Sequence, residues 1–115
     1  MTPFKVGDVV SVEFPFSDFQ TYKRRPGLVL VGGEMDLLVA RLTTHPPREP
    51  SDVVMKRWSD IGLPRASTIR LTKLTVIDHR LVHHKIGRLH PDHGHAVLQA
   101  WQQMTTALAA KLMKL

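Results

Sequence analysis

Residues 67–77 read STIRLTKLTVI, and this stretch decides the fold class. Apolar and polar side chains alternate along it, and β-branched residues are frequent, which indicates a half-buried strand. With a period of two, Thr68, Arg70 and Thr72 share one face, and the apolar residues between them face the core. The sequence therefore predicts a central strand with a cation on its polar face.

Similar but shorter segments lie on both sides of this strand. Residues 8–14 alternate as a half-buried strand would, and Pro15 ends the pattern. Polar, basic and proline-rich composition predicts long loops over 15–26 and 45–50. The other expected strands cover residues 27–31, 36–43 and 52–58, with a last short strand at 84–89.

The C-terminal part has a different period. Pro91 suits the first position of a helix, and Asp92 suits its positive end. Apolar residues then recur at helical spacing, which predicts an amphipathic helix that packs this stripe on the sheet. The stripe consists of Leu98, Trp101, Thr105, Leu108, Leu112 and Leu115. The expected fold is mainly β, a small, strongly curved barrel with one C-terminal helix, in a single domain over residues 1–115.

Composition narrows the class of protein. The chain has 115 residues and no cysteine, which excludes disulfides and thiolate metal sites. No apolar run approaches the ~20 residues that span a bilayer, and the N-terminus lacks the apolar core of a signal peptide. We therefore expect a cytoplasmic protein without a membrane partner.

Charge points to a polyanionic partner. Lys and Arg number 16 against 10 Asp and Glu, a net charge of +6 with histidine neutral. Residues 23–25 are Lys-Arg-Arg, and Phe16, Phe19 and Tyr22 lie just upstream. Cations beside aromatic rings are typical of single-stranded nucleic-acid binding, in which phosphates meet the cations and bases stack. The alternative, a solvated basic loop that serves solubility, remains open.

The chain also holds seven histidines. His90, His93 and His95 are closely spaced, but they straddle a turn and a helix start, and we expect them to be solvated or capping rather than metal ligands. No cofactor is expected. His45 follows Thr43 and Thr44 and is a candidate acid or base, because imidazole changes charge near neutral pH.

Three groups of residues make the sequence resemble PemK/MazF-type toxins. The first is the opening Gly7-Asp8-Val9-Val10 together with Phe14-Pro15-Phe16-Ser17-Asp18. The second is Lys23-Arg24-Arg25-Pro26-Gly27-Leu28-Val29-Leu30. The third comprises Leu42-Thr43, residues 62–78 and Gly87-Arg88-Leu89. The resemblance covers nearly the whole chain and is weakest at residues 45–60.

This resemblance implies an SH3-like barrel, a homodimer and the cleavage of single-stranded RNA without a metal. The RNA's own 2′-hydroxyl would attack the adjacent phosphate and leave a 2′,3′-cyclic phosphate. A cognate antitoxin would inhibit by laying an acidic and apolar tail into the RNA groove. The resemblance assigns catalysis to Arg25, Thr43 and Arg70. Together with the basic and aromatic segment, it leads us to expect RNA binding by Phe19, Gln20, Tyr22, Lys23, Arg24, His45, Ser67, Thr72 and Lys73.

Three positions depart from the family pattern. Some PemK relatives carry an acidic residue where this chain has Thr72, and a histidine where it has Phe19; the acidic residue of the MazF branch falls on Gln20. No conventional general base is therefore visible at the expected places. Two alternatives follow: a non-enzymatic toxin that binds DNA gyrase, since the fold is shared with such toxins, and a degenerate nucleic-acid-binding module.

Overall fold

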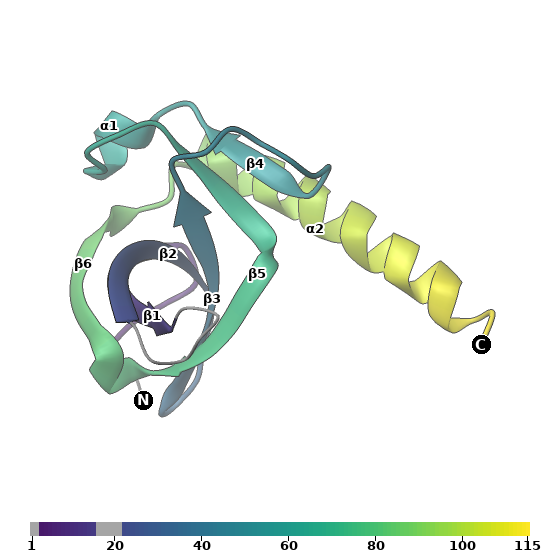
Figure 1. Cartoon of the computed structure of the whole chain (residues 1–115), viewed down its shortest axis with the longest axis horizontal. Coiled ribbons are helices and arrows are strands. Elements are labelled where there is room, and N and C mark those ends of the chain that lie inside the picture. The colour runs from purple at the N-terminus through teal and green to yellow at the C-terminus, as the bar shows by residue number, and fades with distance from the viewer. Residues whose placement is uncertain (1–2, 16–21) are drawn as a thin grey trace.

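One antiparallel sheet of six strands forms most of the protein (Figure 1). The computed structural model describes residues 3–15 and 22–115, without the side chains of Pro15 and Tyr22. The strands are β1 (Asp8–Pro15), β2 (Tyr22–Gly32), β3 (Asp36–Thr43), β4 (Asp52–Met55), β5 (Ser67–Asp78) and β6 (Val82–Arg88). Their order in the sheet is β4-β5-β3-β2-β1-β6. The helices are α1 (Trp58–Ile61), the short 3-10 helix η1 (His79–Leu81) and α2 (Pro91–Leu112).

The sheet curls, and both of its faces are buried. Inside the curl lies a cluster of Val10, Val12, Phe14, Val29, Leu37, Val39 and Ile77. A second cluster lies on the other face, beneath the two helices, and includes Val9, Leu28, Leu42, Met55, Ile69, Leu71 and Val97. Val9 and Val10 are both fully buried although they point to opposite faces. The expected curved β fold is confirmed, but the expectation that β1 is half-buried is wrong.

β2 begins earlier than the sequence indicated. Residues 22–26 were expected in a loop, yet they pair with β1, with Arg24 opposite Glu13 and Arg25 opposite Val12. Pairing with β1 satisfies backbone hydrogen bonds of this segment, and residue composition does not reveal such pairing. The basic residues are therefore held in a strand.

Elsewhere the boundaries differ by smaller amounts. The strand at 36–43 is confirmed, and the last strand covers Val82–Arg88 rather than 84–89. The segment 52–58 is a strand only to Met55, because α1 follows. Gly62 ends α1 with a φ of 104°, a left-handed conformation that favours glycine.

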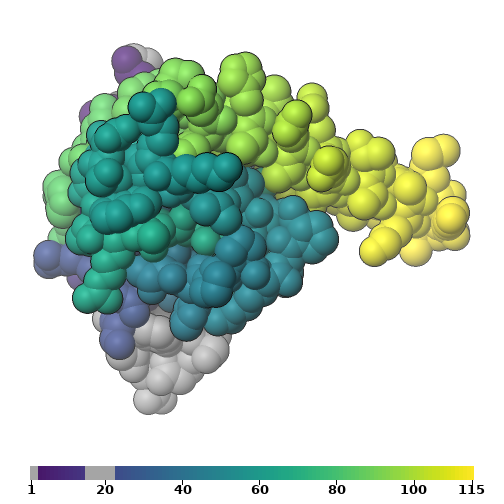
Figure 2. All heavy atoms as spheres, turned by 90° about the horizontal axis from the view of Figure 1, so that it is seen from above, coloured from purple at the N-terminus to yellow at the C-terminus, as the bar shows by residue number. Residues whose placement is uncertain are grey.

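The expected packing stripe of α2 holds at Trp101 but is wrong for most of its length. Leu98 is 51% exposed, Leu108 54% and Leu115 97%. The helix packs instead through buried His93, Val97 and Ala100, with Trp101 and Met104 partly buried beside them. Only the first turns of α2 cover the sheet, and its C-terminal half projects beyond the body of the molecule (Figure 2). None of the described helices combines the length and the hydropathy needed to cross a bilayer.

Asp8 ties the start of β1 to β6. Its side chain is 1% exposed and accepts hydrogen bonds from Arg88 Nη1 at 2.7 Å and from the Lys5 backbone N–H at 2.9 Å. Lys85 Nζ lies 3.2 Å away. Burial alone raises the pKa of Asp8, but these donors and charges outweigh it and hold the pKa below its ordinary value.

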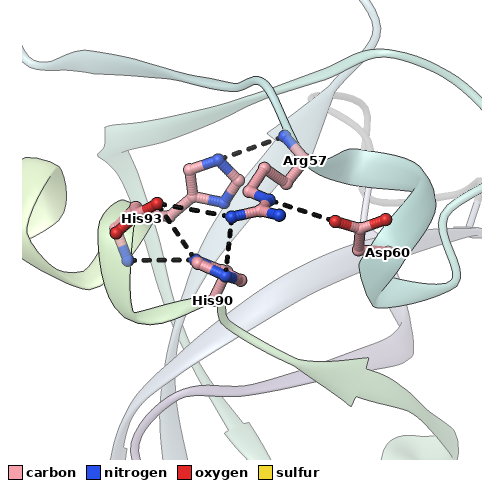
Figure 3. Close-up of polar contacts among 5 residues, drawn as sticks. Arg57, Asp60, His90 and His93 are labelled. Atoms are coloured by element: carbon pink, nitrogen blue, oxygen red, sulfur yellow. Dashed lines mark hydrogen bonds and ion pairs between the residues drawn. The ribbon is translucent and has the colours of Figure 1, made fainter.

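A polar junction joins α1 to α2 (Figure 3). The backbone N–H of Arg57 donates to Nε2 of buried His93 at 3.2 Å. The guanidinium of Arg57 lies 3.0 Å from His90 Nε2 and 3.1 Å from the Asp60 carboxylate. His90 Nδ1 also caps α2 by accepting from the Asp92 N–H. His90 is thus a capping residue as expected, whereas the expectation that His93 is solvated or capping is wrong.

This junction predicts a loss of stability in mild acid. Burial, followed by the positive charges of His90 and Arg57 and opposed by Asp92, lowers the pKa of His93. The unfolded chain therefore binds the proton more readily, so this stability is present above about pH 6.5 and is lost as the pH falls. The melting temperature should fall between about pH 7.5 and about pH 5.5, a range in which Asp8 stays ionised.

Replacing His93 tests the source of this pH dependence. The variant His93→Gln keeps an acceptor for the Arg57 N–H but has no proton to gain, so its melting temperature should change less over the same range. His95→Gln is the matched control, because His95 is exposed on the same helix. An equal pH dependence in wild type and His93→Gln would contradict the assignment.

Candidate functional site

A row of charged side chains crosses the middle of the sheet. Arg70 of β5 lies opposite Asp52 of β4 on one side and opposite Arg41 of β3 on the other. Arg41 in turn lies opposite Gly27 of β2. A Cβ at Gly27 would collide with the Val39 side chain, so this position must stay without one. In this cross-strand order of Asp52, Arg70, Arg41 and Gly27, Arg41 is the charged residue nearest to β2 and follows buried Val39 on its own strand face.

Arg25 and Thr43 belong to the same face of the sheet. Arg25 lies two residues before Gly27, and Thr43 lies two residues after Arg41, so the period of two directs all of them to one side. Thr68 of β5 lies opposite Thr43 and adds a second hydroxyl on this face. The three residues expected to be catalytic, Arg25, Thr43 and Arg70, thus share one face.

A pocket of about 490 Å³ opens where these strands end. β2 contributes Arg25 and β3 contributes Arg41, and the loop before β5 contributes Arg65. The full lining is Arg24, Arg25, Pro26, Arg41, Leu42, Thr43, Thr44, His45, Leu63, Pro64, Arg65 and Ser67. These residues include four arginines and no carboxylate, so the described lining favours an anion.

The polar groups of the pocket have defined partners. The backbone N–H of His45 donates to Oγ1 of Thr43 at 3.2 Å, which leaves the hydroxyl proton of Thr43 available to a ligand. The hydroxyl of Ser67 donates to the Arg65 carbonyl at 2.9 Å, and Ser67 is buried. His45 is exposed and is the one histidine of this lining.

The charge of Arg70 is paired with two carboxylates. Its Nε lies 3.4 Å from Asp52 Oδ1, and its Nη2 lies 3.6 Å from Glu49 Oε1. Glu49 also accepts a hydrogen bond from Oγ1 of Thr72 at 2.9 Å. Arg70 is not among the residues that line the pocket. β4 and the segment before it thus bring two carboxylates, Asp52 and Glu49, to the outer end of the charged row.

Sequence reasoning missed Arg41 and Arg65. The Arg41 guanidinium lies 6.0 Å from the centre of the Phe14 ring, a distance at which a cation is attracted to the ring face. Burial, followed by the charges of Arg25 and Arg70, lowers the pKa of Arg41. The signal for Arg41 was present, because it precedes Thr43 by two residues on a predicted strand. Arg65 lies in a loop and had no such signal.

The other expected RNA-binding residues lie in different places. Arg24, His45 and Ser67 line the pocket with Arg25 and Thr43. Lys23 is exposed on β2. Thr72 and Lys73 are exposed within a bulge, because Arg41 pairs with Arg70 but its neighbour Ala40 pairs with Leu74. Thr72 and Arg70 both contact Glu49, while Ile69 and Leu71 are buried in the core, so the expected alternation holds as far as Thr72.

Two expected contacts, Phe19 and Gln20, lie outside the described residues, as does the side chain of Tyr22. Within the described part of the chain, no three histidine, aspartate or glutamate side chains gather as a metal site would require.

Comparison with known proteins gives the family and the fold. Residues 5–105 match the family described as the PemK-like, MazF-like toxin of type II toxin–antitoxin systems. A search of curated proteins finds no significant match. An endoribonuclease from mycobacterial species is 18% identical with a TM-score of 0.71, covering 95% of this chain and 94% of that one.

Two further solved structures are complexes. One is an endoribonuclease with its cognate antitoxin from mycobacterial species, 18% identical with a TM-score of 0.72, covering 92% of this chain and 95% of that one. The other is MazE–MazF from Deinococcus radiodurans, 16% identical with a TM-score of 0.71, covering 95% and 98%. These likenesses establish a shared fold. Because the family match spans most of the sequence, the chain belongs to the PemK-like, MazF-like toxins of type II toxin–antitoxin systems.

Proposed function

We propose that this toxin is a sequence-preferring endoribonuclease that cleaves single-stranded mRNA in the cytoplasm without a metal. The observation that carries the proposal is a pocket whose described lining contains four arginines and no carboxylate, with the Thr43 hydroxyl among them. A phosphodiester is the anion that matches this lining, because planar guanidinium groups hold two phosphate oxygens at once. Solved endoribonucleases with the same fold support the proposal.

The chemistry follows from the groups that are present. The 2′-oxygen of the RNA forms a bond to the adjacent phosphorus, and the bond from phosphorus to the 5′-oxygen breaks. Negative charge builds up on the non-bridging oxygens, where Arg25 and the free hydroxyl proton of Thr43 can donate. The products are a 2′,3′-cyclic phosphate and a 5′-hydroxyl. No water is consumed in this step.

His45 is proposed to move protons in this reaction. The 2′-hydroxyl loses a proton and the 5′-oxygen gains one, so the step needs a base and an acid. His45 lines the pocket and is exposed, and histidine is the side chain that most often serves as a general acid or base. This role fits the lack of acidic residues in the described lining.

An antitoxin and a second copy of the chain are the proposed protein partners. An acidic segment of an antitoxin would compete with RNA for the same arginines.

A separate apolar hollow of about 490 Å³ lies between β2 and the start of α2, with Val31 55% exposed and Leu98 51% exposed at its edge. We propose that two copies pair across this hollow. A monomeric mass by light scattering at working concentrations would rule this pairing out.

The proposed reaction predicts the chemical ends of the products. Purified toxin incubated with single-stranded RNA in EDTA should cut it and leave 2′,3′-cyclic phosphate and 5′-hydroxyl ends, which mass spectrometry distinguishes from the alternatives. Binding without cleavage would favour a degenerate nucleic-acid-binding module. Toxicity in cells without RNA binding or cleavage would favour a protein target such as gyrase.

Replacing Arg25 should remove most of the activity. Loss of one donor to the transition state costs about 100-fold to 1,000-fold in rate, so Arg25→Ala should abolish growth arrest and nearly all RNA cleavage. Arg80→Ala is the matched control, because it also removes one positive charge but its guanidinium is exposed and pairs with Asp78. Circular dichroism would verify that both variants are folded. Full activity of Arg25→Ala would remove Arg25 from the mechanism.

The role of His45 predicts a change in pH dependence. In His45→Ala the rate of RNA cleavage should fall by about 100-fold or more, and the limb of the pH–rate profile near neutral pH should disappear. His84→Ala serves as the control, since His84 is exposed on β6 and does not line the pocket. An unchanged profile in His45→Ala would exclude the role in proton transfer.

A further inference from the structure

Arg41 is a cation surrounded by other cations. Across the sheet it pairs with Arg70, and its side chain lines the same pocket as Arg24, Arg25 and Arg65. The two nearby carboxylates, Asp52 and Glu49, lie against Arg70 instead. Among the described residues, no ion pair to Arg41 is formed. Within the described part of the chain, the charge of Arg70 is therefore compensated by carboxylates and that of Arg41 is not.

The position of Arg41 is unfavourable for the protein alone. Partial burial removes water from the guanidinium, and the charges of Arg25 and Arg70 add repulsion, which is why the pKa of Arg41 is lowered. The Phe14 ring beneath it offsets only part of this cost. An apolar or hydroxyl side chain at position 41, on the same strand face as Val39, would carry no charge to desolvate or repel. The unfavourable charge is relieved when an anion enters the pocket.

We infer that Arg41 directly binds a non-bridging phosphate oxygen of the RNA strand, next to the phosphate that Arg25 contacts. The inference rests on the proposed function and adds a substrate-binding residue to it. The Phe14 ring lies against one face of the Arg41 guanidinium. The N–H groups at the edge of the guanidinium can then donate to a phosphate in the pocket. Arg70, already neutralised by Asp52 and Glu49, contributes less to the affinity for RNA.

Salt dependence of RNA binding measures this contact. Each phosphate contact on a single strand contributes about 0.7 to the slope of log affinity against log salt concentration. Binding of a labelled, mixed-sequence RNA that is 2′-O-methylated, and so cannot be cleaved, would be followed by fluorescence anisotropy. Arg41→Gln should weaken binding by about tenfold and reduce the slope by about 0.7. Arg80→Gln, which removes an exposed and paired charge, should keep the wild-type slope.

Thermal stability separates a binding role from a structural one. Without RNA and at low salt, Arg41→Gln should melt no lower than wild type, because the substitution removes repulsion from Arg25 and Arg70. Inorganic phosphate should raise the melting temperature of wild type more than that of Arg41→Gln. A lower melting temperature with undiminished stabilisation by phosphate would mean that Arg41 is structural, and would overturn the inference.

The outcomes also distinguish this inference from the proposed function. If wild type binds the RNA and Arg41→Gln keeps the wild-type affinity and slope, the inference about Arg41 is wrong and the proposed function stands. If wild type does not bind the RNA at all, both are wrong.

Discussion

The burial of the inner face of the curled sheet is the constraint on which the site depends. Val10, Val29 and Val39 fill the curl, and the interior ends at Phe14. The same strand face continues with Arg41 on β3, and with Gly27 and then Arg25 on β2. Side chains there cannot join the apolar interior, because the strands end and the pocket opens. The fold thus places cations at the rim of its own core.

Carboxylates are distributed so that this rim stays positive. Asp8 is buried at the start of β1, where it binds Arg88 and Lys85 of β6. Asp52 and Glu49 approach the charged row only at its outer end, where they hold Arg70. The described lining of the pocket contains none. A net charge of +6 is therefore less informative than where the compensating charges lie.

Local patterns predicted the elements better than their packing. The strands at 36–43 and 67–77 and the helix start at Pro91 agree with the structure to within about a residue. The stripe expected on α2 failed because a period of 3.6 identifies an apolar face but not the length over which a sheet lies beneath it. Half of α2 has no such support. β1 was misjudged for a related reason, because polar Ser11 is buried on a face that reads as exposed.

By itself the sequence determined the β class, the C-terminal helix, the family resemblance and the basic segment at 23–25, because these depend on residue types at short spacing. Only the tertiary structure decided which cations share a pocket. Arg41 and Arg25 are 16 positions apart, yet the antiparallel register of β2 and β3 places them on one face. The register also places Asp52 opposite Arg70, with which it forms an ion pair, and leaves Arg41 without an ion pair among the described residues. Strand pairing joins residues far apart in sequence, and no local pattern encodes it.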